Sequence, residues 1–195
     1  MKSLILDSAT KTLYVALVSD DELLFEKYIT GRNDHAKFIV KTIEDALNEN
    51  KLTVNDLNEV IVGVGPGSYT GSRMAVTVGK MLNMLDNITL YKISTLKLIA
   101  SACKGVTLSE ISAKHDNYFS MIIDNDKNEY VLKEGFYNIE ELQKYQYQNT
   151  VSDEDFKVDY RYVLKNKEIV DVPDLLVPNY LRDTEAERNL NDKNL

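Results

Sequence analysis

The segment from Gly63 to Arg73, with the sequence GVGPGSYTGSR, constrains the fold of this chain more than any other part of it. It overlaps EVIVGVG (59–65), a nearly continuous apolar run that predicts a central strand buried on both faces. Pro66 fixes its own φ, and Gly67 allows a turn in which a side chain would clash. The segment therefore predicts a tight passage from a buried strand into a helix that begins near Gly71 and ends near Leu85.

Known phosphate-binding motifs do not match this loop. The sequence has no Gly-Lys-Ser or Gly-Lys-Thr run, which a P-loop requires, and its glycines are spaced one residue too far apart for a dinucleotide-binding loop. The free N–H groups at a helix start nevertheless favour anions. Two interpretations stay open, a strand-to-helix turn without a ligand and an anion or nucleotide contact. The residues of that contact would be Gly67, Ser68, Thr70 and Arg73.

The rest of the pattern predicts an α/β protein, and its 195 residues are enough for one large domain or for two small lobes that share a core. We call residues 1–102, which show the order β-β-β-α-β-α-β-α, the first lobe and the less clearly patterned residues 103–195 the smaller second lobe. In the first lobe we expect strands at 3–7, 12–19, 22–29, 59–65 and 91–94, and helices at 35–50, 71–85 and 94–103. In the second lobe we expect strands at 107–113, 118–124, 129–137, 160–164, 168–172 and 175–182, and a short helix at 139–146.

Two helices carry more apolar surface than one face of a sheet needs. In the helix at 35–50, which Asn33 or Asp34 is expected to cap, apolar residues recur at helical spacing. In the helix at 71–85, small residues recur every fourth position, and a second stripe is rich in methionine and valine. This helix is either enclosed within the fold or packed on the sheet with one face and on a partner's helix with the other. The interface residues would be Ala36, Val40, Ile43, Leu47, Gly71, Met74, Ala75, Val78, Gly79 and Leu82.

A catalytic or metal site has little support in the sequence. The only two histidines, His35 and His115, form no metal-binding pair, and the single cysteine excludes a thiolate zinc site and an internal disulfide. Asp7, at the end of the first strand, is expected to orient a turn by accepting backbone N–H groups. Asp124 and Asp126 are expected in a hairpin turn. The net charge of −8 disfavours direct nucleic-acid binding.

The order of several segments resembles the bacterial TsaB family, also called YeaZ. LILDSAT, DHAKFIVKTIEDAL, GVGPGSYTGSRMAVTVGKML and ISTLKLIA follow one another as in that family. Its G-P-G-S-[FY]-T-G-x-R signature stands at 65–73, and PNYLR at 178–182 is similar to its late P-x-Y-L-R. The resemblance covers residues 1–102 and is patchy afterwards. Ala75 stands where the family often has glycine, and Ser112-Ala113-Lys114 where it has Asp-Ala-Arg.

The resemblance implies a two-lobe fold of the actin, sugar-kinase and Hsp70 (ASKHA) type, with mixed sheets flanked by helices. It implies a non-catalytic, cytoplasmic subunit that pairs with the catalytic paralogue TsaD to form N6-threonylcarbamoyladenosine at position 37 of tRNAs that read codons starting with A. The ATPase TsaE would complete the complex, tRNA would be contacted only indirectly, and the chain alone would form a homodimer through the same helical surface. No metal or intrinsic cofactor is implied, and ATP or ADP would bind at the junction with TsaD.

Three other functions remain open at this point. One is a nucleotide-binding ATPase or kinase-like protein of the same fold, which would require phosphate loops after the first strand and in the second lobe. Another is a metallopeptidase homologue, which would require metal ligands or a nucleophile with a base. The third is a structural dimer without a role in tRNA modification, which only a test with the partner separates from the first interpretation.

Overall fold

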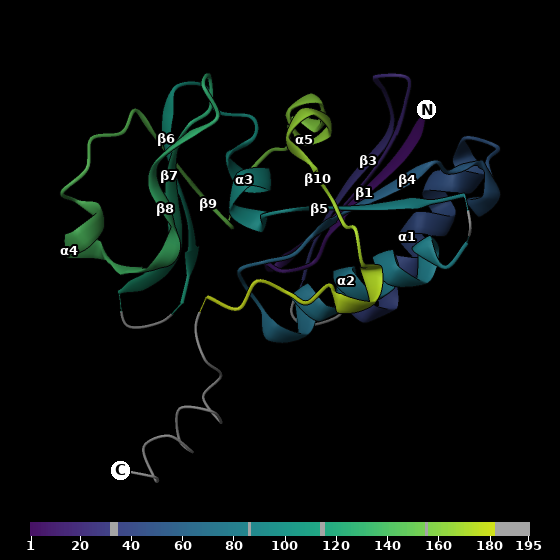
Figure 1. Ribbon diagram of the computed structural model, residues 1–195, viewed down its shortest axis with the longest axis horizontal. Helices are drawn as coiled ribbons and strands as arrows, with labels where there is room; N and C mark the ends of the chain where they lie inside the picture. The colour runs from purple at the N-terminus through teal and green to yellow at the C-terminus, as the bar shows by residue number, and fades with distance from the viewer. Residues whose placement is uncertain (32–34, 86, 114–115, 155, 182–195) are drawn as a thin grey trace, which may run out of the picture.

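A computed structural model describes residues 1–31, 35–85, 87–113, 116–154 and 156–181. Two mixed sheets lie side by side, and helices flank the larger one on both faces (Figure 1). The first sheet has the strand order β10-β5-β4-β1-β2-β3 and the second the order β8-β7-β6-β9. The strands of the first sheet are β1 (Lys2–Asp7), β2 (Thr12–Ser19), β3 (Glu22–Thr30), β4 (Glu59–Gly63), β5 (Thr89–Ile93) and β10 (Glu168–Ile169). Those of the second are β6 (Val106–Ser112), β7 (Asn117–Asp124), β8 (Glu129–Asn138) and β9 (Asn149–Ser152).

The first sheet is buried on both faces at its centre. β1 pairs antiparallel with β2 and parallel with β4, and β4 pairs parallel with β5. Because side chains alternate along a strand, Leu4 and Leu6 belong to one core cluster and Ile5 to another on the opposite face. All five residues of β4 are buried, which confirms the central strand predicted from its apolar run.

Helices cover the two faces of this sheet. The α-helices are α1 (His35–Glu49), α2 (Tyr69–Asn83), α3 (Thr95–Ala100), α4 (Ile139–Leu142) and α5 (Tyr160–Asn166), and the short 3-10 helices are η1 (Val54–Asp56) and η2 (Pro173–Leu175). Residues of α1 and α2 pack in the cluster that contains Leu4, and residues of α3 and α5 in the cluster that contains Ile5. Among the helices of the described residues, none is long and apolar enough to cross a membrane.

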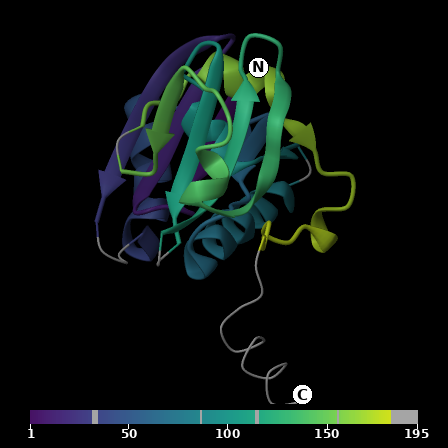
Figure 2. The ribbon, with the colours of Figure 1, turned by 90° about the vertical axis from the view of Figure 1, so that its left-hand side faces the viewer.

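The second lobe contains the second sheet and α4. Figure 2 looks along the long axis of Figure 1, with the second sheet facing the viewer in front of the first. β7 pairs antiparallel with both β6 and β8, and β6 pairs parallel with β9. After β9 the chain returns to the first lobe, where β10 pairs with β5 and Val163 of α5 packs in the cluster of Ile5. The boundary between lobes at residue 102 stays a prediction.

Most expected elements are present, although the helices expected at 94–103 and 139–146 are shorter, and the larger differences lie after residue 148. The strand expected at 160–164 is wrong, because this segment is α5: Asp159 caps it by accepting from the backbone N–H of Arg161, and Val163 is buried. The strand β9 was not expected. Of the strand expected at 168–172 only two residues pair, and residues 176–181 form no strand. The cap expected at Asn33 or Asp34 lies outside the described residues.

Candidate partner-binding face and glycine loop

The glycine loop (64–68) lies at the carboxyl edge of the first sheet, where β1, β4 and β5 end. The hydroxyl of Ser68 caps α2 by accepting from the backbone N–H of Gly71 at 3.2 Å. The backbone N–H of Ser68 donates to the carbonyl of Ala9 at 2.6 Å, and this bond holds the loop against the turn that follows β1. At Gly67, where φ is 150°, a Cβ would lie 2.2 Å from that same carbonyl oxygen, so the close approach requires glycine.

Asp7 connects β1, the glycine loop and α3. Its side chain is 2% exposed. One carboxylate oxygen accepts from the backbone N–H of Ala9 at 2.7 Å and the other from the hydroxyl of Thr95 at 2.5 Å. The Thr95 hydroxyl accepts in turn from the backbone N–H of Gly65 at 3.0 Å. The prediction that Asp7 orients the turn through a backbone N–H is confirmed.

Burial raises the pKa of Asp7 to about 6, against the opposing effects of the bonds from Thr95 and Ala9 and of the nearby His35. Gly63 makes room for this carboxyl group, since a Cβ there would lie 1.6 Å from a carboxylate oxygen of Asp7. Strand, loop and helix are thus joined through one buried acid whose charged form is disfavoured.

The polar groups expected to contact an anion make bonds within the chain. Both the N–H and the hydroxyl of Ser68 have partners, as described above. The Nε of Arg73 donates to the hydroxyl of Tyr180 at 2.7 Å, and its guanidinium lies 4.1 Å from the ring centre of Tyr69. Thr70 is exposed. The anion contact stays a prediction. In the structure, Ser68 and Arg73 make hydrogen bonds that hold the loop, α2 and Tyr180 together.

The other ionisable candidates have structural partners. A ring nitrogen of His35 lies 3.0 Å from the carbonyl oxygen of Thr10, and His115 lies outside the described residues. Asp124 accepts from the backbone N–H groups of Asp126 and Lys127, which confirms the hairpin turn. Within the described ranges, no three His, Cys, Asp or Glu side chains gather where they could hold a metal ion.

The ten residues predicted at a partner interface differ in how far they are exposed. Ile43, Leu47, Gly71, Ala75 and Gly79 are buried, whereas Ala36 and Val40 are exposed and Met74, Val78 and Leu82 half-buried. The small-residue stripe of α2 brings this helix close to its own sheet: a Cβ at Gly79 would lie 2.4 Å from a methyl carbon of Val62. The interface role of the ten residues stays a prediction, and the buried five are covered by their own lobe.

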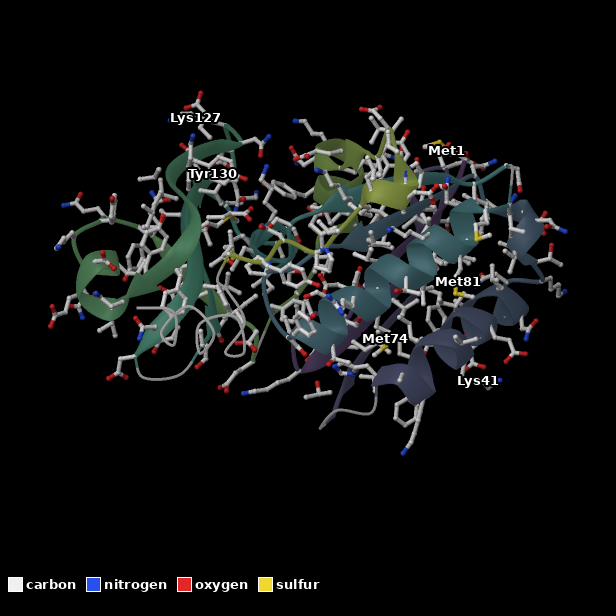
Figure 3. All side chains as sticks on the ribbon, turned by 60° about the horizontal axis from the view of Figure 1, so that its bottom comes forward. Met1, Lys41, Met74, Met81, Lys127 and Tyr130 are labelled. Atoms are coloured by element: carbon white, nitrogen blue, oxygen red, sulfur yellow. The ribbon has the colours of Figure 1, made fainter. Side chains whose placement is uncertain are left out.

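An apolar strip remains exposed on α1 and α2. Val40 on α1 is 66% exposed, and Met81 and Met84 at the end of α2 are 63% and 81% exposed. Figure 3 shows Met74 and Met81 along the side of α2 that is turned towards α1. We call this surface the helical face; its residues are Ala36, Val40, Met74, Val78, Met81, Leu82, Met84 and Leu85.

Sequence reasoning missed the contacts of the segment after α5 and β10. We call residues 172–181 the strap. The backbone N–H of Asn179 donates to the carbonyl of Val64 at 2.7 Å, and its side-chain amide donates to Glu134 of β8 at 3.1 Å. The ring of Tyr180 stacks on Tyr69, with centroids 5.3 Å apart. PNYLR was noted as a motif, but only the tertiary structure brings its Asn179 to the glycine loop.

Comparisons with known proteins agree with this architecture. A family model described as "TsaD: tRNA N6-adenosine threonylcarbamoyltransferase" matches residues 29–173. The "tRNA threonylcarbamoyladenosine biosynthesis protein TsaB" of Bacillus subtilis is 31% identical over 101 residues, which cover 52% of this chain and 44% of the relative. The protein of the same name in Escherichia coli is 27% identical over 133 residues, which cover 66% and 57%.

The chain belongs to the TsaB/YeaZ branch of the TsaD family. Its matched part spans about half the length of these curated TsaB relatives. Two solved structures of YeaZ-type proteins from Pseudomonas aeruginosa have TM-scores of 0.75 and 0.73 at 17% and 18% identity. They cover 93% and 92% of this chain and 99% of their own. These neighbours confirm the ASKHA-like fold, with mixed sheets flanked by helices, that the family resemblance implied.

Proposed function

We propose that this chain is a non-catalytic subunit that pairs with TsaD in the formation of N6-threonylcarbamoyladenosine in tRNA. The names of the curated TsaB relatives assign them to this biosynthesis, and the chain shares their family. The observation that carries the proposal is the helical face, an exposed apolar strip on two adjacent helices.

The physical argument begins with the exposure of these side chains. Val40, Met81 and Met84 are each more than half exposed, and a group of exposed apolar side chains marks an interaction surface. Methionine is unbranched and adapts its shape to an opposing surface, so it suits a face that binds two partners in turn. We therefore assign this face to TsaD in the complex and to a second copy of the chain in its absence.

The partners of the buried ionisable groups support a non-catalytic role. Asp7 and His35 bond to the backbone around the first turn, and the hydroxyl of Thr95 donates to Asp7. A general base must reach a substrate proton, whereas these groups are buried within the first lobe.

The charge of the chain and its glycine loop complete the proposal. Because the chain has a net charge of −8, it should repel the tRNA phosphates, so TsaD and TsaE would make the tRNA contacts of the complex. ATP or ADP would bind at the junction with TsaD. The loop residues Gly67, Ser68, Thr70 and Arg73 would then contribute to a shared site.

The test is size-exclusion chromatography with light scattering, on the chain alone and mixed with TsaD from the same organism. We expect a homodimer that converts into a one-to-one heterodimer. Val40→Asp should weaken both assemblies, because it places a charge on the helical face. Val131→Asp is the matched control, since Val131 is a half-exposed valine of β8 in the second lobe. A wild-type chain that does not bind TsaD would refute the proposal.

A further inference from the structure

Glu134 of β8 joins the second sheet to the strap and to α3. One oxygen of its carboxylate accepts from the side-chain amide of Asn179 in the strap at 3.1 Å, and the other accepts from the hydroxyl of Tyr130 at 3.3 Å. The hydroxyl of Ser94, the residue that caps α3, is hydrogen-bonded to the same carboxylate. Segments from three distant parts of the sequence therefore meet at one acid.

The carboxylate of Glu134 is costly to bury, and its polar neighbours offset this cost. Burial raises the pKa of Glu134 above its ordinary value of 4.5, because water solvates the ionised form better than the protein interior does. Hydrogen bonds from Ser94 and Tyr130 and the charge of the buried Lys97 lower this pKa, whereas the charge of Glu168 raises it. The contact between Glu134 and the strap is thus held by hydrogen-bond donors against the tendency of the carboxylate to return to water.

Asn179 contacts both the second sheet and the glycine loop. Its side chain donates to Glu134, while its backbone N–H donates to the carbonyl of Val64 at 2.7 Å. The hydroxyl of the next residue, Tyr180, accepts from the Nε of Arg73 near the start of α2. In Figure 1 the yellow strap runs from beside α2 towards the second sheet. The end of the strap therefore bridges the second sheet, the glycine loop and α2.

Apolar packing anchors the strap only as far as Pro178. Leu176 packs against the core cluster beneath α2 and Pro178 is buried, whereas Leu175 and Val177 are exposed. The two residues that follow Pro178 are half-buried or exposed. Few buried apolar contacts are the mark of a segment that opens locally, without unfolding of the rest of the chain. The hydrogen bonds at this end therefore decide whether the strap stays on the loop.

We propose that Glu134 and Asn179 form a latch, through which the second sheet holds the end of the strap on the glycine loop. The structure shows the latch closed. When it opens, the N–H of Asn179 leaves the carbonyl of Val64 and the hydroxyl of Tyr180 leaves Arg73, so the end of the strap no longer covers the loop. The latch concerns this chain by itself and does not depend on the binding of TsaD.

The test follows the backbone N–H at position 179 by hydrogen exchange, measured by NMR on the folded full-length chain. This N–H reports the opening of the strap, because it donates to the carbonyl of Val64. The N–H of Val64 itself donates to the carbonyl of Ile93 at the end of β5 at 3.0 Å. Its exchange is the internal reference, because global unfolding exposes both groups whereas opening of the latch exposes the first.

Asn179→Asp sets a second carboxylate against Glu134 and keeps the size of the side chain. We expect the protection of the N–H at position 179 to fall at least about tenfold, and that of Val64 to stay at its wild-type value. Asn166→Asp is the matched control, because it adds the same charge where the amide donates to a backbone carbonyl of α5. Asn179→Ala removes the donor without adding a charge, and should lower the protection at position 179 in the same direction.

A double substitution tests whether the two side chains act on each other. Glu134→Gln/Asn179→Asp exchanges the amide and the carboxylate between β8 and the strap and keeps both side-chain lengths. We expect the protection at position 179 to return to within about threefold of wild type, since an amide again donates to a carboxylate. Two independent effects on stability would add up and would not cancel.

Three results would overturn the latch. The first is unchanged protection at position 179 in both Asn179→Asp and Asn179→Ala. The second is an equal loss of protection at position 179 and at Val64, which would show global destabilisation. The third is a double variant that stays as open as Asn179→Asp. All of these measurements are made without TsaD, so the latch and the proposed function can fail separately.

Discussion

Replacement of the buried acid Asp7 tests the geometry of the first-lobe core most directly. Asp7→Asn keeps the shape of the side chain and its acceptor oxygen for the N–H of Ala9. It removes the titration of a group whose pKa burial raises to about 6 from an ordinary value of 3.8. The variant should therefore change how stability depends on pH, in addition to any constant cost from the altered bond to Thr95.

The direction in which stability changes with pH follows from proton binding to Asp7. Between pH 4 and 6 the folded wild type holds a proton at Asp7 that the unfolded chain has already lost, so its stability falls as pH rises through this window. The contribution of the protonated acid is fully present below about pH 4 and lost above about pH 6. A shift of about two pKa units corresponds to about 3 kcal/mol. The asparagine variant has no such dependence.

The assay is urea unfolding at several pH values for both proteins, with stability taken as the free energy of unfolding. We expect the stability of Asp7→Asn relative to wild type to rise by about 2–3 kcal/mol between pH 4 and 7. Asp124→Asn is the control: the bond from Lys127 lowers the pKa of the Asp124 carboxyl below its ordinary value of 3.8, so its contribution is lost only at lower pH and its difference from wild type should stay nearly flat between pH 4 and 7. If the stability of Asp7→Asn relative to wild type did not change with pH, or fell as pH rose, the pKa of Asp7 would not be raised in the folded chain.

Four further substitutions, of which Thr77→Arg is a control, test the packing of the first lobe. Thr95→Val removes the donor to Asp7 and the acceptor of the Gly65 N–H, and chemical unfolding should show a loss of about 1–3 kcal/mol. Ala75→Arg should unfold the chain, because Ala75 is 0% exposed, whereas Thr77→Arg on the exposed side of α2 should melt within a few degrees of wild type. Gly79→Val should cost at least about 1–3 kcal/mol, since even its Cβ would lie 2.4 Å from a Val62 methyl carbon; a wild-type melting temperature would contradict the close approach of α2.

Local pattern determined much of the first lobe. An apolar run such as 59–65 has to be buried on both faces, and the glycines and proline after it leave few paths other than a sharp turn into a helix. Ser68 was predictable as a cap for a similar reason, because the free N–H groups of a helix start need an acceptor within a few residues. These features depend on neighbours in sequence, and the structure confirms them.

Two features depended on the tertiary structure. Both stripes of α2 are apolar, so periodicity alone did not reveal that Ala75 and Gly79 face their own sheet while Met81 stays exposed. Arg73 and Tyr180 are 107 positions apart, and no local pattern predicts their bond. The sequence alone thus determined that the chain has a buried strand, a glycine turn and an apolar helix. The tertiary structure decided which helix face and which side of the strap remain exposed, because that depends on what the rest of the chain has already covered.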